Sequence, residues 1–257
     1  MAHKINRQAE TEREKEFLKR FNSLCQTRSS WQVWADFITA VAITLANTTE
    51  QNQKIRDKRE KEFADCIERL GGQDIPAEML GIITMALEEN PEQDFLGNLF
   101  MKLELGNHWR GQFFTPYSLC ELMAELNSEN LNKEIEEKGW VSVNDCACGA
   151  GATLIAAANV FKKHDVNYQD HALFVAQDID RVAGMMCYIQ LSLLGCPGYV
   201  VIADSISSPA TGKGTLFPEE KEDQEFWYTP MWYSDTWNMR RTWNLMDLML
   251  RKMSNGL

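Results

Sequence analysis

Apolar residues follow two patterns along the chain, and the point where one pattern replaces the other divides the chain into two parts. In the first hundred or so residues they recur at helical spacing among opposite charges, which is typical of amphipathic helices with solvated faces. The expected helices are 10–24, 31–46, 51–70, 77–89 and 92–105. Segment 31–46 is strongly apolar, but it is too short to span a bilayer and contains Asp36, so we expect a buried helix. The pattern predicts an all-helical domain over residues 1–106.

Beyond residue 139, short apolar runs alternate with helical segments. The runs 140–143, 172–176 and 199–203 are rich in branched apolar residues, which is the composition of buried parallel strands. The expected helices are 117–126, 153–161 and 182–194. Alternation of this kind predicts an α/β unit over residues 107–257, with a parallel sheet whose ligand crevice lies at the carboxyl ends of the strands.

An acidic residue stands at or just after the end of each expected strand, namely Asp145, Asp178 and Asp204. The first is followed by a turn of small residues containing Gly149 and Gly151, which then opens a helix. A strand, a glycine turn and a helix N-terminus form the nucleoside- and phosphate-binding corner of doubly wound folds. An acid closing the second strand is placed to accept hydrogen bonds from ribose hydroxyls, so the pattern predicts a nucleoside-containing ligand.

Composition narrows the class of protein. The formal net charge of −11 argues against free-standing nucleic-acid binding, because phosphate contacts need clustered Lys and Arg. The seven cysteines have no regular spacing and fit a reducing cytosol. Cys146, Cys148, Cys187 and Cys196 form no Cys-x-x-Cys pair, so we expect small buried residues and no metal site. The polar start of the chain does not resemble a signal peptide, and we expect a cytoplasmic protein without membrane contact.

The end of the chain combines an acidic linker, an aromatic stretch and one more helix. The linker covers 207–225, the aromatic stretch 226–237 and the helix 238–253. Apolar residues of the helix alternate in spacing between four and three, which is typical of a helix seam. They are Met239, Trp243, Met246, Leu250 and Met253. Packing against the sheet is the favoured interpretation, and a face for a partner or DNA is the alternative.

These motifs resemble those of the adenine-specific (N6) DNA methyltransferases related to the modification subunit of type I restriction systems. Residues 111–116 (GQFFTP) are similar to the family's loop over the methionine end of S-adenosylmethionine, and 145–151 (DCACGAG) to its glycine motif. Asp178 matches the ribose-binding acid, and Asp204 the acid that meets the adenine amine. The resemblance implies a Rossmann-like methyltransferase sheet after an all-helical N-terminal domain. It also implies S-adenosylmethionine as cofactor, bound by Phe113, Thr115, Pro116, Asp145, Gly149, Gly151, Asp178, Ile179, Asp204 and Ser205.

The chain departs from the family at the catalytic signature. Asn/Asp-Pro-Pro-Tyr/Phe, which holds the amine of a flipped adenine and stacks on the base, is absent from the sequence. The nearest candidates are Thr229, Pro230 and Trp232, within the stretch YTPMW. Because little chain follows Asp204, we expect an incomplete sheet with fewer than the seven strands typical of the family.

Two functions remain open from the sequence. In the first, the protein is a methyltransferase-like component of a restriction-modification type system, with a divergent or incomplete base pocket. In the second, it is a non-catalytic regulator or decoy of a modification system that binds the cofactor or a partner. Both imply a protein partner or a homo-oligomer, and DNA contact chiefly through a partner. Whether the chain is itself an enzyme is left open by the missing signature.

Overall fold

The computed structural model describes residues 11–105, 113–211 and 216–254, and side chains as far as Arg251. Its first part is helical, as expected. The helices are α1 (Glu12–Leu24), α2 (Ser30–Ala46), α3 (Gln53–Leu70), α4 (Asp74–Glu89) and α5 (Phe95–Lys102). Local signals set their ends: Thr11 and Glu14 form a capping box at α1, and Gly71 ends α3 with a left-handed φ of 85°.

The second part alternates strands and helices. In chain order the elements are α6 (Tyr117–Asn127), α7 (Leu131–Lys138), β1 (Val141–Asp145), α8 (Ala152–Lys163), α9 (Tyr168–His171), β2 (Ala172–Asp178), α10 (Arg181–Leu193), β3 (Gly198–Ile202), β4 (Glu225–Tyr228), the 3-10 turn η1 (Pro230–Tyr233) and α11 (Asp235–Ser254). The described sheet has four strands in the order β1-β2-β3-β4. The first three run parallel, and β4 runs antiparallel to β3. The protein is thus a helix-rich α/β chain.

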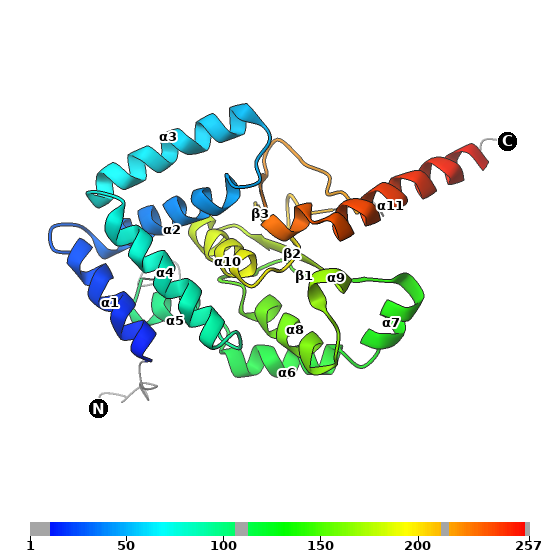
Figure 1. Ribbon diagram of the computed structural model, residues 1–257, viewed down its shortest axis with the longest axis horizontal. Helices are drawn as coiled ribbons and strands as arrows, with labels where there is room; N and C mark the ends of the chain where they lie inside the picture. The colour runs from blue at the N-terminus through cyan, green and yellow to red at the C-terminus, as the bar shows by residue number, and fades with distance from the viewer. Residues whose placement is uncertain (1–10, 106–112, 212–215, 255–257) are drawn as a thin grey trace.

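One continuous apolar core joins the helical part to the sheet. Helices α8 and α10 lie on one face of the sheet, and α2 packs against the outer side of α10 (Figure 1). The same core contains Phe37 of α2, Phe95 of α5, Tyr188 of α10 and Phe174 of β2, all fully buried. The helical part therefore buttresses the strands directly. The predicted boundary at 106 falls in 106–112, outside the described residues, and stays a prediction.

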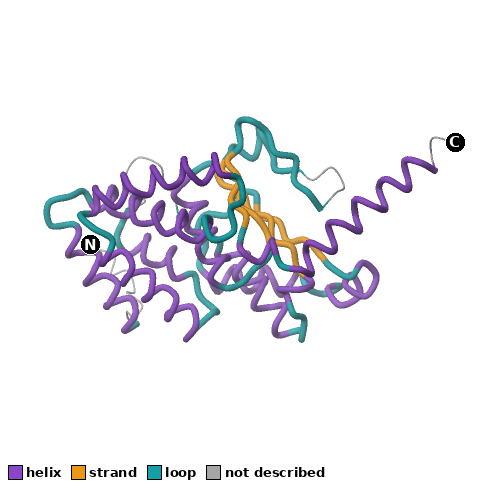
Figure 2. Tube along the Cα trace, turned by 45° about the horizontal axis from the view of Figure 1, so that its top comes forward, coloured by secondary structure: helices purple, strands orange, loops and turns teal. Residues whose placement is uncertain are grey.

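The other face of the sheet is covered by the end of the chain. Tyr199 and Val201 of β3 pack there against Trp232 of η1 and Trp237 of α11. Beyond this contact α11 extends away from the rest of the molecule (Figures 1 and 2). No helix in the described ranges is long and apolar enough to cross a membrane.

The interpretation of the α11 apolar residues as a sheet-packing seam is wrong. Met239, Trp243, Met246 and Leu250 are exposed, whereas the helix packs through Trp237 and Arg241 on its opposite side. Periodicity in the sequence revealed an apolar face but could not tell which face meets the core, because both carry large side chains. The position of Met253 falls outside the described side chains.

Candidate functional site

The turn between β1 and α8 is built around the carboxylate of Asp145. One carboxylate oxygen accepts a hydrogen bond from the backbone N–H of Ala147 at 3.0 Å, and the other accepts one from the Thr153 hydroxyl. Gly149 and Gly151 have φ values of 54° and 98°. Residues that carry a side chain rarely adopt such backbone angles, so the turn requires glycine. The N–H of Cys148 donates to the carbonyl of Gln177 at 3.0 Å and ties the turn to β2.

The stretch after residue 112 folds over this turn. A Cβ added to Gly149 would lie 2.9 Å from the ring of Phe114, which also packs on Phe100 with 5.2 Å between ring centroids. Phe114 is therefore a packing residue, while Phe113 stays 82% exposed. A cavity of about 70 Å³ lies between the two segments, lined in part by Phe113, Thr115, Asp145 and Gly149. The structure thus brings the two predicted motifs together.

The second acid, Asp178, contacts the same turn. Its Oδ2 accepts a hydrogen bond from the N–H of Gly149 at 2.8 Å, and its Oδ1 accepts one from the N–H of Asp180 at 2.8 Å. Burial raises the pKa of this carboxyl, against the lowering by the two N–H groups. Each oxygen keeps acceptor capacity beyond its one backbone contact.

The third acid, Asp204, lies beyond β3 at the same edge of the sheet. Its Oδ1 accepts a hydrogen bond from the N–H of Ile206 at 2.9 Å, and this contact lowers its pKa. The ends of β2 and β3 are joined there, because the N–H of Ala203 donates to the carbonyl of Asp178 at 3.0 Å. Ile179 is exposed beside them, and Ser205 follows Asp204 directly. The predicted residues after the three strands therefore gather at one edge.

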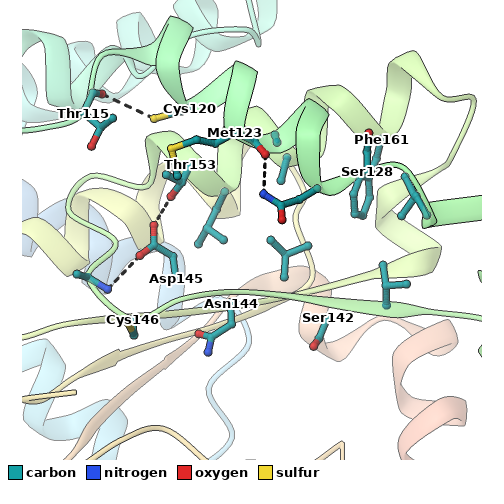
Figure 3. A pocket seen from close by; sticks show the side chains of 18 of the residues that line it. Thr115, Cys120, Met123, Ser128, Ser142, Asn144, Asp145, Cys146, Thr153 and Phe161 are labelled. Carbon is teal, nitrogen blue, oxygen red and sulfur yellow. Dashed lines mark hydrogen bonds between the residues drawn. The ribbon is translucent and has the colours of Figure 1, made fainter. Parts of the chain in front are cut away.

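A larger cavity of about 610 Å³ opens beside β1 (Figure 3). It lies between β1, α6, α7 and α8, along the side of β1 that pairs with no strand of the described sheet. Thr115, Asp145 and Thr153 line it as well as the smaller cavity. Asp178 and Asp204 line neither of these two cavities.

Comparison with known proteins identifies the family. Residues 100–246 match the family model described as N-6 DNA methylase. The matched segment is more than half of the chain and contains all three acids and the glycine turn.

The chain belongs to the N-6 DNA methylase family.

The solved structures similar to this N-6 DNA methylase family member include one restriction-modification protein. It is the type I restriction-modification system methyltransferase subunit from Streptococcus thermophilus, with 12% sequence identity and a TM-score of 0.42. The similarity covers 79% of this chain and 61% of that chain, so the present chain spans less than two thirds of the subunit's length. A search of curated proteins found no match.

A buried network that the sequence reasoning missed supports the glycine turn of this methylase-family chain. Gln190 on α10 donates from Nε2 to Oδ1 of Asp94 and to the carbonyl of Ala150, both at 2.8 Å. Oδ1 of Asp94 also accepts from the N–H of Gly97 at 2.8 Å, which caps α5. Complete burial raises the pKa of Asp94. An Asp three residues before a glycine at a helix start is a capping signal that could have drawn attention to it.

The catalytic candidates Thr229, Pro230 and Trp232 lie at the wrong edge of the sheet. Because β4 is antiparallel to β3, Thr229 follows β4 beside the amino end of β3, opposite the three acids. Its hydroxyl donates to the carbonyl of Cys196 at 2.7 Å and accepts from the N–H of Gly198 at 3.0 Å. Pro230 opens η1, and Trp232 is buried. These residues hold the strand end together, and their assignment to a base pocket is wrong.

Nothing in the described part of the chain indicates a metal-binding site. Within residues 11–105, 113–211 and 216–254, no group of three or more His, Cys, Asp or Glu side chains is placed to hold a metal ion. Cys148 and Cys187 are buried beneath the glycine turn. The hydrogen bond to Cys187, together with burial, raises the pKa of the Cys148 thiol, and burial raises the pKa of the Cys187 thiol. A Cβ on Gly151 would lie 2.8 Å from the sulfur of Cys187, so this thiol is a packing neighbour of the turn.

Proposed function

We propose that this chain binds S-adenosylmethionine at the carboxyl ends of β1, β2 and β3 and serves N6-adenine methylation in a restriction-modification type system. The observation that carries the proposal is the convergence of Asp145, Gly149 and Asp178. Two acids from neighbouring strands close on one glycine turn at the N-terminus of α8. The close approach of Phe114 to Gly149 means that a larger residue would disturb the turn.

Each residue of the proposed site has a binding role. Asp178 has acceptor capacity left for the ribose hydroxyls, and Asp204 is partly exposed, which leaves it accessible to the adenine amine. The exposed side chain of Ile179 offers an apolar surface to the adenine ring. Gly151 lets the chain enter α8, and Ser205 offers a hydroxyl beside Asp204. When bound, the cofactor would supply an activated methyl group on its sulfonium.

The loop after residue 112 would cover the methionine end of the cofactor. Phe113, Thr115 and Pro116 all come from this loop, and the first two line the small cavity against Asp145. The exposed ring of Phe113 can move over a ligand without breaking core packing, because Phe114 supplies the anchoring contact. Covering the site would exclude water from the methyl group.

The base pocket is the divergent part of the proposal. Methylation of adenine requires the base to be flipped out of the helix and its amine to be held in line with the methyl group. The described residues around Asp204 offer carboxylates and small hydroxyls but no aromatic platform of the family's motif. We therefore propose that a partner contributes the groups that hold the base.

A non-catalytic binding role is the second candidate. It is favoured by the position of Thr229, whose hydroxyl is fully engaged at the opposite edge, and by the net charge of −11. In that case the cofactor site would serve regulation of a modification system or capture of a partner. The chemistry of the carboxyl edge would be the same, but no methyl transfer would follow.

Calorimetric titration of the whole chain with S-adenosylmethionine tests the binding site. Asp178→Asn should weaken binding at least about ten-fold, because hydrogen bonds to a charged group contribute ~1.5–3 kcal/mol. Asp65→Asn, at an exposed position of α3, is the matched control and should leave the affinity unchanged. Wild-type protein that does not bind, or equal affinities for both variants, would contradict the proposed site.

Transfer of a labelled methyl group to unmethylated genomic DNA separates the two functions. The chain alone should transfer little or nothing, because it lacks the base-holding motif. Binding that never leads to transfer, even with a cell extract that supplies partners, selects the non-catalytic role. Transfer that depends on the extract and is lost in Asp178→Asn supports the methyltransferase.

A further inference from the structure

The outer face of α11 carries a row of exposed apolar side chains. Met239, Trp243, Met246 and Leu250 are 63, 68, 48 and 63% exposed. We call these four residues the α11 seam. On the opposite side of the helix, Trp237 and Arg241 are buried and Asn244 accepts a hydrogen bond from the N–H of Leu216 at 3.1 Å. The helix is thus already fixed to the body through one face, and the seam is a second face that no described element covers.

The spacing of the α11 seam indicates that its binding partner is another helix. Steps of four, three and four residues keep the side chains on one stripe of the helix, which is the pattern of positions that interlock between paired helices. Single exposed apolar residues are ordinary, but a contiguous row of this kind marks an interaction surface. The seam runs from Met239 to Leu250, so about 18 Å of the helix is available for pairing.

We propose that the α11 seam binds the α11 seam of a second copy of this chain, with the two helices antiparallel. In this arrangement Trp243 of one copy faces Met246 of the other, and Met239 faces Leu250. Each layer joins different side chains, and the flexible thioether of methionine packs well against an aromatic ring. In a parallel pair, Trp243 would instead face Trp243 of the other copy. That layer would be bulkier than the layers on either side of it.

Charges beside the seam favour the same orientation. Arg240 and Asp247 each follow a seam residue directly, and antiparallel pairing places Arg240 of one copy opposite Asp247 of the other, twice by symmetry. The guanidinium of Arg240 lies 5.5 Å over the ring of Trp237 and forms no salt bridge with a described residue. Asp247 now pairs with Arg251 one turn away at 2.8 Å on an exposed surface, a contact that is weak and easily exchanged.

The shape of the molecule also accommodates a second copy. Because α11 leaves the body near its amino end and extends outward (Figure 2), antiparallel pairing places the two bodies at opposite ends of the helix pair. Two chains of net charge −11 are thereby kept apart, while the paired segment itself carries four basic and two acidic residues. Long-range repulsion between the bodies is reduced by that separation.

Light scattering coupled to size exclusion, over a range of concentrations of the full chain, tests the proposal. The wild type should reach twice the 29.5 kDa mass of the chain. Trp243→Glu should give a monomer, because each copy would bury a charge in the seam. Leu245→Glu is the matched control: this residue of the same helix is 38% exposed but lies outside the seam, so the dimer should persist.

Charge reversal tests the orientation. Asp247→Arg alone should weaken the dimer at least about five-fold, since two opposite-charge pairs become like-charge pairs. The double variant Arg240→Asp with Asp247→Arg should recover the wild-type dissociation constant in the antiparallel pair. In a parallel pair the double variant would place a second carboxylate opposite Asp235 and would not recover.

Three results would overturn the inference. A wild-type chain that stays monomeric at every concentration would show that another protein, and not a second copy, covers the seam. A dimer that survives Trp243→Glu with normal helix content by circular dichroism would place the interface elsewhere. Failure of the double charge reversal to recover dimerisation would exclude the antiparallel register.

Discussion

The two edges of the parallel strands carry similar kinds of residue and use them differently. At the carboxyl edge, Asp178 retains acceptor capacity and Asp204 is partly exposed. At the amino edge, the Thr229 hydroxyl both donates and accepts within the core, and Trp232 packs between Tyr199 and Tyr228. The acids of the carboxyl edge keep part of their hydrogen-bonding capacity unused, whereas the Thr229 hydroxyl uses its own within the core. This difference separates sites from packing more reliably than the residue types do.

Of the variants Trp232→Ala, Gly149→Ala and Asp94→Asn, the first should lose the most stability. The damage should be confined to the packing at the amino edge. The ring contacts Tyr228 at 5.1 Å between centroids and lies under the guanidinium of Arg241 at 4.0 Å. Removing a buried Trp costs about 3–5 kcal/mol in the free energy of unfolding. Leu126→Ala, at a residue of α6 that is 72% exposed, is the control and should cost under about 0.5 kcal/mol.

The comparison predicts that this loss leaves ligand binding intact. S-adenosylmethionine affinity of folded Trp232→Ala protein, measured well below its melting temperature, should equal that of the wild type. Urea denaturation gives the stabilities and calorimetry the affinities. A large loss of affinity in a variant that remains folded would mean that the amino edge takes part in the site.

Gly149→Ala should have a smaller effect on stability and a direct effect on binding. A left-handed φ of 54° costs an L-residue roughly 1–2 kcal/mol, and the new Cβ would press on the ring of Phe114. Displacement of that ring should loosen the loop over the site and weaken cofactor binding. Gly72→Ala is the control, because its φ of 133° is also unfavourable but its Cβ would meet nothing within 4 Å. Equal cofactor affinities for both variants would contradict the role given to the Phe114 contact.

Asp94→Asn should change the free energy of unfolding least of the three variants, and the change should depend on pH. Because burial raises the pKa of Asp94, the folded state keeps a proton that the unfolded state has released. The free energy of unfolding therefore falls as pH rises from the ordinary carboxyl pKa through the raised one. Asn retains an acceptor for Gly97 and Gln190 and removes the titration. The wild-type-minus-variant stability should decrease with rising pH over that window; a constant difference in urea titrations would contradict the burial effect.

The sequence predicts the helical part and the parallel strands well for a physical reason. Amphipathic spacing, the capping residues and the branched strand runs are local signals, and they identify α1–α5 and β1–β3 within a few residues. Strand β4 was missed because Glu225–Tyr228 is short and both its faces meet aromatic residues, so no alternation is visible. Helix α9 was missed because it has only four residues, and α7 was missed because its eight residues include only two apolar ones, Leu131 and Ile135.

The candidate site was predictable only where it depends on strand ends. The positions of Asp145, Asp178 and Asp204 follow from parallel topology, since the carboxyl ends of parallel strands meet at one edge. The network of Asp94 and Gln190 joins residues almost a hundred positions apart and has only a local capping signal in the sequence. The mistaken base pocket arose because the antiparallel direction of β4, which moves Thr229 to the far edge, cannot be read from the stretch itself.

Hydrogen exchange with and without S-adenosylmethionine tests most directly that the carboxyl edge is the binding edge. The account predicts slower exchange on ligand addition in the glycine turn around Gly149 and at the start of α10 after Asp178, where backbone N–H groups surround the proposed site. Exchange around Gly198 and Thr229, at the amino edge, should not change. Protection of the amino edge, or no protection at the glycine turn under saturating ligand, would contradict the account.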